Sequence, residues 1–252
     1  MIPKIIHYCW FGRNPLPPLA IKCIESWKKY LPDYEIQEWN EDNFDVNIIP
    51  YTQEAYQAKK FAFVSDYARL WILYNYGGIY FDTDVELIKP IYDIIQRGPF
   101  WGSEGSIFNI NIISVAPGLG IGSYAKHDVY KQFLDYYSTA HLINNKNNKL
   151  GYITIVDIAT NILSSLGWEK KNKLQKINDM YIYPIDFFAP IDMITNKLIV
   201  TSNTRSIHWY SGSWVDKKHK KSLKNYIRKI IPPFLLIQYH YCPLKIANSS
   251  LK

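Results

Sequence analysis

Residues 61–86, FAFVSDYARLWILYNYGGIYFDTDVE, constrain the fold of this chain more than any other stretch. The apolar residues of the first part recur at helical spacing, and Gly77 and Gly78 supply the left-handed stop with which helices often end. A short apolar run, Ile79–Phe81, follows as a covered strand and leads directly into two aspartates. The stretch therefore predicts a helix, a sharp turn and a buried strand with acidic side chains at its end.

The charged residues of this stretch form two candidate site elements. Asp66 and Arg69 are three residues apart, so they share one face of the predicted helix. Asp82 and Asp84 follow the strand, and on an extended backbone residues two apart project to the same side. Two carboxylates in one small volume are the hard oxygen ligands that Mg²⁺ or Mn²⁺ prefers. We predict Asp82 and Asp84 as metal ligands, with a solvated turn as the alternative for an isolated Asp-x-Asp.

The rest of the chain predicts an α/β fold. A strand at 3–10, a helix at 19–30 and a strand at 34–39 alternate in the order of an α/β sheet, in which ligands collect outside the carboxyl ends of the strands. Later patterns favour strands at 100–101, 107–115 and 181–183 and helices at 127–142 and 154–166. Residues 116–122 are rich in glycine but lack both dinucleotide-binding spacing and a phosphate-loop lysine, so we expect a flexible loop there.

Composition narrows the class of protein. With 252 residues, 48% of them hydrophobic, the chain suits one sizeable domain, and its 21 Tyr and 8 Trp suit platforms for sugars or bases as well as a core. The scattered cysteines Cys9, Cys23 and Cys242 indicate free thiols in a reducing compartment. No signal peptide and no stretch of roughly 20 apolar residues is evident. We therefore expect a cytoplasmic location.

The net charge of +7 is concentrated near the C-terminus. Residues 217–229 hold seven basic and no acidic side chains, and the remaining chain has 22 of each sign, so the uniformly basic face of a nucleic-acid binder is absent. Apolar residues at 223, 226, 227 and 230 predict an amphipathic helix. Such a helix suits peripheral binding to an anionic membrane, here the inner face of the plasma membrane. The alternative is an ordinary surface helix whose charged face is solvated. We divide the chain into a catalytic domain, 1–215, and a basic tail, 216–252.

Other chemistries fit the sequence less well. A phosphatase-type aspartate motif like that of haloacid dehalogenase-like enzymes would need Thr or Val where Glu86 stands, and a later adjacent aspartate pair is missing. No paired-cysteine zinc pattern and no Gly-x-Ser-x-Gly elbow occur. Cys9 lies two residues from His7, and we interpret both as core residues. Metal binding by the aspartates is thus preferred over nucleophilic catalysis by them.

Three sequence blocks in a fixed order resemble one known family. Residues 65–69, SDYAR, with 74–84, YNYGGIYFDTD, closely resemble the DXD-containing sugar-transfer region of glycosyltransferase family 32. Residues 5–12, IIHYCWFG, look like the opening strand of that family, and 207–209 with 212–214 look like its closing motif. The resemblance covers residue 2 to about 214 and extends distantly to the catalytic core of the large clostridial glucosylating toxins.

The resemblance implies a GT-A fold, a Rossmann-like mixed sheet flanked by helices, here with a C-terminal helical tail. It also implies Mn²⁺ or Mg²⁺, a nucleotide-sugar donor, most simply a UDP-sugar, and transfer with retention at the anomeric carbon. Carried over by position, Trp10 contacts the base, Asp66 and Arg69 hold the sugar and diphosphate, and Asp84 ligates the metal while Asp82 contacts the ribose or the metal.

The remaining positions carried over from the family lie near the C-terminus and beside the DXD motif. His208 is a further metal ligand, Ser213 and Trp214 close over the diphosphate, and Tyr80 joins the donor-binding residues. The chain departs from the family near residue 156, where a glycine or proline is common. Asp157 is there either an acceptor contact or a residue that favours the helix start.

The functional hypothesis is a metal-dependent retaining hexosyltransferase. It would transfer a sugar from a nucleotide-sugar to a saccharide or lipid-linked saccharide in the biosynthesis of a surface polysaccharide, such as capsule or lipopolysaccharide. Two alternatives stay open at the level of sequence. One is a secreted effector that glycosylates a protein, and the other is a non-catalytic sugar-binding module.

Overall fold

A computed structural model describes residues 1–142 and 153–212. The chain up to Ser211 forms one compact unit. The predicted tail helix and the division after residue 215 lie outside the described residues, as does Cys242. Cys9 and Cys23 are buried free thiols.

The centre of this unit is an eight-stranded mixed sheet with the order β2-β1-β3-β7-β5-β9-β8, in which β6 pairs with β5. Its strands are β1 (Ile5–Cys9), β2 (Glu35–Trp39), β3 (Gly78–Tyr80), β5 (Phe100–Ser106), β6 (Asn109–Ala116), β7 (Ile121–Ser123), β8 (Gln175–Ile177) and β9 (Met180–Tyr183). β1 is parallel to β2 and β3, whereas β7 runs antiparallel to both β3 and β5. β3 and β5 are therefore parallel to each other, and their carboxyl ends meet at one edge of the sheet.

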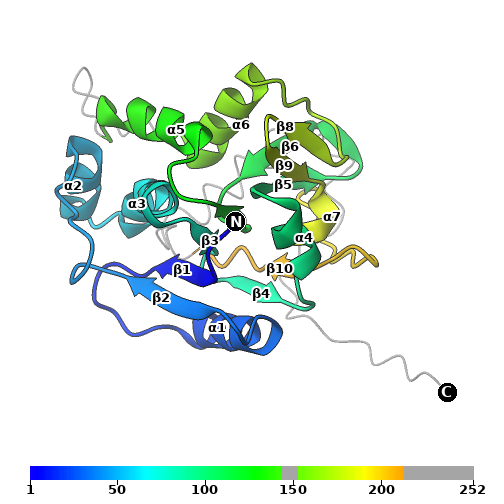
Figure 1. The fold of residues 1–252 in the computed structure, drawn as a ribbon, viewed down its shortest axis with the longest axis horizontal. Helices are drawn as coiled ribbons and strands as arrows, with labels where there is room; N and C mark the ends of the chain where they lie inside the picture. The colour runs from blue at the N-terminus through cyan, green and yellow to red at the C-terminus, as the bar shows by residue number, and fades with distance from the viewer. Residues whose placement is uncertain (143–152, 213–252) are drawn as a thin grey trace. The chain divides into compact units, whose positions relative to one another are not determined.

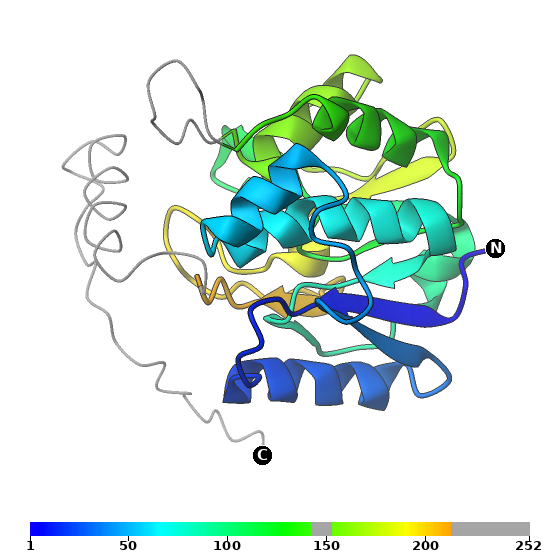
Figure 2. The same ribbon diagram turned by 90° about the vertical axis from the view of Figure 1, so that its left-hand side faces the viewer.

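Helices cover this sheet, which confirms the predicted α/β class (Figure 1). They are α1 (Pro18–Tyr30), α2 (Pro50–Gln57), α3 (Phe61–Tyr76), α4 (Tyr92–Arg97), α5 (Asp128–Ser138), α6 (Ile155–Ser165) and α7 (Ile185–Phe188). Figure 2 shows α1 on one side of β1 and β2 and α3 on the other. Among the helices of the described residues, none combines the length and the apolar character needed to cross a bilayer.

The predicted glycine stop ends α3 at the expected place. Gly77 is the C-cap with φ +67°, and its N–H donates to the carbonyl of Leu73 at 2.9 Å. Gly78 also has positive φ, and a Cβ there would lie 2.8 Å from Nε2 of His7. The two glycines thus let the chain leave the helix and run close beside β1, which fixes where β3 begins.

His7 and Cys9 belong to the core, as predicted. Both are buried, and the indole of Trp39 donates to Nδ1 of His7 at 3.1 Å, so the proton sits on Nε2, which donates to the carbonyl of Gly77 at 2.9 Å. Burial lowers the pKa of His7 to about 4 and raises the pKa of Cys9 to about 12. Neutral imidazole and thiol are therefore the forms present near neutral pH.

The predicted loop at 116–122 is confirmed only for residues 117–120, which form a turn, and the expectation that the whole stretch is a loop is wrong. Residues 116–123 are buried, and Ile121–Ser123 form β7 between β3 and β5. Gly122 makes this possible because the ring of Phe100 lies against its backbone, 2.3 Å from where a Cβ would be. The glycine-rich sequence is thus a buried turn that continues into a strand in close contact with an aromatic ring.

The start of α6 resolves the two interpretations of Asp157. Thr154 is the N-cap, and its hydroxyl accepts from the N–H of Asp157 at 3.1 Å while the Asp157 carboxylate accepts from the N–H of Thr154 at 3.3 Å. This reciprocal pair is a capping box. Asp157 therefore acts as a helix-start residue.

Candidate active site

Asp82 and Asp84 lie in a tight turn that follows β3 and precedes β4 (Val85–Leu87). The N–H of Val85 donates to the carbonyl of Asp82 at 3.0 Å, which closes the turn. The expectation of an extended backbone is wrong here because the chain leaves the large sheet and enters a separate two-stranded sheet of β4 and β10 (Ser206–His208). The turn, rather than strand alternation, brings the two carboxylates together.

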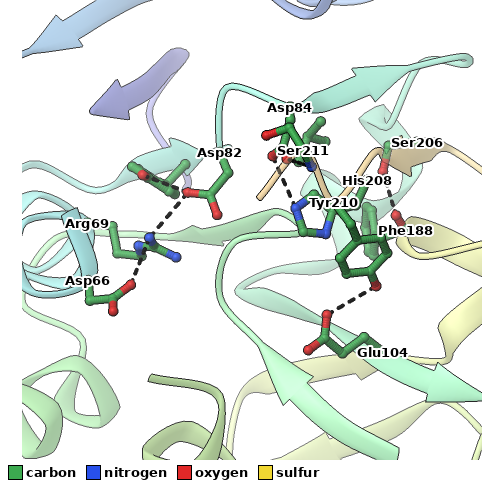
Figure 3. Close-up of polar contacts among 12 residues, drawn as sticks. Asp66, Arg69, Asp82, Asp84, Glu104, Phe188, Ser206, His208, Tyr210 and Ser211 are labelled. Carbon is green, nitrogen blue, oxygen red and sulfur yellow. Dashed lines mark hydrogen bonds and ion pairs between the residues drawn. The ribbon is translucent and has the colours of Figure 1, made fainter. Parts of the chain in front are cut away.

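His208 completes a cluster with these aspartates. β10 pairs antiparallel with β4, with His208 opposite Val85, and Nε2 of His208 lies 3.1 Å from Oδ1 of Asp84 (Figure 3). One ligand atom from each of Asp82, Asp84 and His208 lies within 4.8 Å of the others. Two carboxylates and an imidazole form a donor set that suits a divalent cation such as Mn²⁺. The structure thus brings together the three residues predicted as metal ligands.

The Asp84 carboxylate and the His208 imidazole influence each other's proton affinity. Burial acts to raise the pKa of Asp84, but the neighbouring His208 and the hydrogen bond from the Ser211 N–H outweigh it and hold that pKa well below its usual range. Burial acts to lower the pKa of His208, but the charge of Asp84 raises it overall. A metal ion would displace the imidazole proton on binding. Nδ1 of His208 is buried and has no hydrogen-bond partner in the described part of the chain.

Arg69 connects the two predicted site elements. Its guanidinium lies 3.0 Å from Oδ1 of Asp66 on the same helix and 3.3 Å from Oδ1 of Asp82 (Figure 3). The hydroxyl of Tyr80 donates to the same oxygen of Asp82 at 2.9 Å, and the guanidinium carbon lies 5.0 Å from the centre of the Tyr80 ring. Burial raises the pKa of Asp66 to about 7, although Arg69 opposes the shift. Asp82 is therefore held from two sides, and one cation serves two carboxylates.

Gly118, which the sequence analysis did not select, forms the wall behind Asp82. Its carbonyl accepts from the N–H of Asp82 at 3.1 Å, and a Cβ on it would lie only 2.1 Å from Oδ2 of Asp82. The sequence offered one signal. Gly118, Gly120 and Gly122 recur at every second position, which is the period of a β-strand and of the backbone that leads into it.

Glu104 and Tyr210 are also absent from the sequence-based candidates. Glu104 lies near the carboxyl end of β5 and is buried, and its Oε2 accepts from the hydroxyl of Tyr210 at 3.1 Å (Figure 3). The apolar pattern predicts this strand only as far as Trp101, whereas β5 continues to Ser106, so Glu104 falls in a segment for which the sequence predicts no element. Glu104 becomes recognisable as a site residue only from the sheet topology, in which β5 runs parallel to β3.

The remaining predicted residues are less closely tied to the cluster. Trp10 follows β1 and is half-buried, and its indole N–H donates to the carbonyl of Asn14 at 2.6 Å within its own loop. Ser213 and Trp214 lie outside the described residues. Their roles at the donor stay predictions.

With this geometry in place, comparison with known proteins identifies the class. Residues 17–101 match the family described as the glycosyltransferase sugar-binding region containing DXD motif. The relatives include an uncharacterized glycosyltransferase, L373, of Acanthamoeba polyphaga mimivirus, 27% identical over 75% of this chain and 75% of its own. The chain thus contains a DXD-type glycosyltransferase sugar-binding region, which confirms the predicted glycosyltransferase class and the resemblance seen in the sequence.

Fungal relatives are named for a particular transfer. Inositol phosphoceramide mannosyltransferase 3 of Schizosaccharomyces pombe is 32% identical over 46% of this chain and 34% of its own. Mannosyl phosphorylinositol ceramide synthase CSH1 of Saccharomyces cerevisiae is 22% identical over 90% of this chain and 57% of its own. This chain thus spans only part of the length of the fungal proteins. A solved structure, PaToxG Glycosyltransferase, superimposes with a TM-score of 0.49 at 21% identity, over 65% of this chain and 69% of that one.

Proposed function

We propose that this protein is a metal-dependent retaining hexosyltransferase that moves a sugar from a nucleotide-sugar to a saccharide or lipid-linked saccharide acceptor. The observation that supports this most is the convergence of Asp82, Asp84 and His208 within 4.8 Å, beside a guanidinium that already contacts Asp82. Hard oxygen donors, an imidazole and a planar cation are the groups that a diphosphate and its counter-ion require.

Each of these side chains has a role in this proposal. Asp82, Asp84 and His208 would hold Mn²⁺ or Mg²⁺, which when bound offsets several kcal/mol of the charge that develops on a leaving diphosphate. Arg69 is buried and always charged, so it offers a fixed fork to phosphate or sugar oxygens. Asp66, held 3.0 Å from Arg69, can accept hydrogen bonds from sugar hydroxyls. The chain's own residues would thereby orient the donor.

The names of the fungal relatives refine the proposal for substrate. They describe mannosyl transfer to inositol phosphoceramide, a lipid, which supports a lipid-linked acceptor here and makes mannose a candidate beside the sugars of UDP donors. We place this transfer in the synthesis of a surface polysaccharide, at the inner face of the plasma membrane. The basic pattern of residues 217–229 supports that location.

The test is release of nucleotide by the purified protein from UDP- and GDP-hexoses, with and without Mn²⁺ or Mg²⁺. Asp84→Asn should reduce turnover at least about 100-fold, since a lost metal contribution of several kcal/mol corresponds to two or more factors of ten. Asp135→Asn is the matched control, because Asp135 lies on the exposed surface of α5 and pairs with Lys131. Undiminished turnover in EDTA, or a fully active Asp84→Asn variant, would contradict the metal role.

A further inference from the structure

The segment 206–211, here named the closing segment, holds Asp84 from several directions. The N–H of Trp209 donates to the Asp84 carbonyl at 3.0 Å, and the N–H of Ser211 donates to its Oδ2 at 2.8 Å. His208 approaches Oδ1 at 3.1 Å. Backbone and side chain of Asp84 are therefore both fixed by a segment that is more than 120 residues away in sequence.

Tyr210 gives the closing segment its shape. It has φ +48°, a left-handed conformation that is uncommon for residues other than glycine. Its ring lies against the ring of His208, with centroids 4.1 Å apart. The left-handed turn lets the chain go from His208 past Asp84 and return with the Ser211 N–H directed at the carboxylate. Such strain persists only where surrounding contacts hold it.

Glu104 provides such a contact from the large sheet. Its Oε2 accepts from the Tyr210 hydroxyl at 3.1 Å, and its side chain is buried beneath the closing segment (Figure 3). The pairing of β5 with β6 shifts register between Glu104 and Ser106. Gly105, at the shift, has φ +138°, and a Cβ there would lie 2.7 Å from the carbonyl of Ile112. Irregularities of this kind re-aim a side chain near a site.

We propose that Glu104 is a positioning residue for the metal centre. By accepting the Tyr210 hydrogen bond, it keeps the closing segment in the left-handed turn that places the Ser211 amide and the His208 imidazole on Asp84. Without that acceptor, Tyr210 relaxes toward an ordinary backbone conformation, and the two contacts to the Asp84 carboxylate loosen together. The part of this inference that concerns metal affinity rests on the proposed function, whereas the part that concerns the closing segment does not.

The first experiment is amide hydrogen exchange on the metal-free protein. Glu104→Met keeps the volume and removes the acceptor, Tyr210→Phe removes only the donor, and Glu104→Gln keeps an oxygen that can accept. Exchange at the Trp209 and Ser211 amides should speed up roughly tenfold in the first two variants, as for the loss of one hydrogen bond, and stay near wild type in the third. Tyr124→Phe, which removes a hydroxyl that donates to Asp179 elsewhere, is the control and should change neither amide.

The amides of β3 serve as an internal reference for folding in each variant. Wild-type exchange at both closing-segment amides in Glu104→Met and in Tyr210→Phe would overturn the proposal. Equal acceleration in Glu104→Gln and Glu104→Met would do so as well, because it would assign the effect to the charge of Glu104 and not to the hydrogen bond.

A second experiment titrates Mn²⁺ by calorimetry. We expect roughly tenfold weaker binding in Glu104→Met and in Tyr210→Phe, with no further loss when both are combined, because residues that act through one contact are not additive. Additive losses would contradict a shared contact. If wild type binds no Mn²⁺ while the exchange results hold, the proposed metal dependence fails and the positioning of the closing segment stands.

Discussion

Replacing Gly118 by alanine should damage the active site while leaving the fold intact. The backbone of Gly118 does not require a positive φ, so alanine can adopt its conformation. The new Cβ would lie 2.1 Å from Oδ2 of Asp82 and 3.4 Å from a guanidinium nitrogen of Arg69. The Asp82 carboxylate therefore has to swing away, and it loses the Arg69 contact at 3.3 Å and the Tyr80 hydrogen bond at 2.9 Å.

The size of the effect follows from those two contacts. Hydrogen bonds to charged groups contribute about 1.5–3 kcal/mol each. The displaced carboxylate loses two such contacts, so the interactions that hold it in its original position weaken by on the order of 3 kcal/mol. If that orientation matters for transfer, kcat/KM falls about 100-fold. The free energy of unfolding changes by less, about 1 kcal/mol, because the Asp82 side chain is 28% exposed and can be hydrated in its new position.

The assay compares donor turnover and urea unfolding for Gly118→Ala and Gly167→Ala. Gly167, just beyond α6, has φ +104° and nothing within 4 Å of an added Cβ. Alanine there strains the backbone and costs about 1 kcal/mol of stability, but it leaves turnover unchanged. A Gly118→Ala enzyme with kcat/KM within about threefold of wild type would refute the conclusion that the close approach of Gly118 positions the Asp82 carboxylate for activity.

Two other predictions concern acid stability and the C-terminal tail. The pKa of His7 is about 4 in the folded protein and 6.5 in the unfolded chain, so its contribution to stability is complete above pH 6.5 and is lost as the pH falls toward 4. The shift corresponds to roughly 3 kcal/mol of the free energy of unfolding. Urea unfolding at pH 7.5 and about 4.5 should show that the difference in this free energy between wild type and His7→Gln becomes smaller at the acidic pH. A difference that is independent of pH would contradict this. Deletion from Asp216 onward should weaken flotation with anionic liposomes at low salt, whereas unchanged flotation would argue against a membrane role for the tail.

The parts of the site that sequence could predict are the local ones. Asp66 and Arg69 meet because residues three apart share a helix face, and that rule holds whatever else the chain does. Gly77 ends α3 because only a residue tolerant of positive φ can close that turn. His208 came from the family resemblance, since nothing local distinguishes a histidine that pairs with a carboxylate 124 residues earlier in the sequence.

The parts that sequence could not predict depend on distant segments. Glu104 and Tyr210 are 106 residues apart, and neither has a spacing that marks it. Gly118 has a role only because Asp82 lies against it. The turn at Asp82 and Asp84 arises because β4 pairs with β10 and does not extend the large sheet. This pairing depends on a strand that begins only at residue 206. The periodicity of apolar residues shows which face of a segment is buried, but it does not show which other segment packs against that face.

The order of segments along the chain has a consequence for the nascent protein. Within residues 1–142 and 153–212, the strands of the large sheet lie between Ile5 and Tyr183, whereas β10 begins only at Ser206. During synthesis the sheet can be complete while the aspartates of the β3–β4 turn still lack the imidazole and the amide that hold them. The metal-binding groups are therefore assembled last, because His208 and the Ser211 amide follow every described strand of the large sheet along the chain.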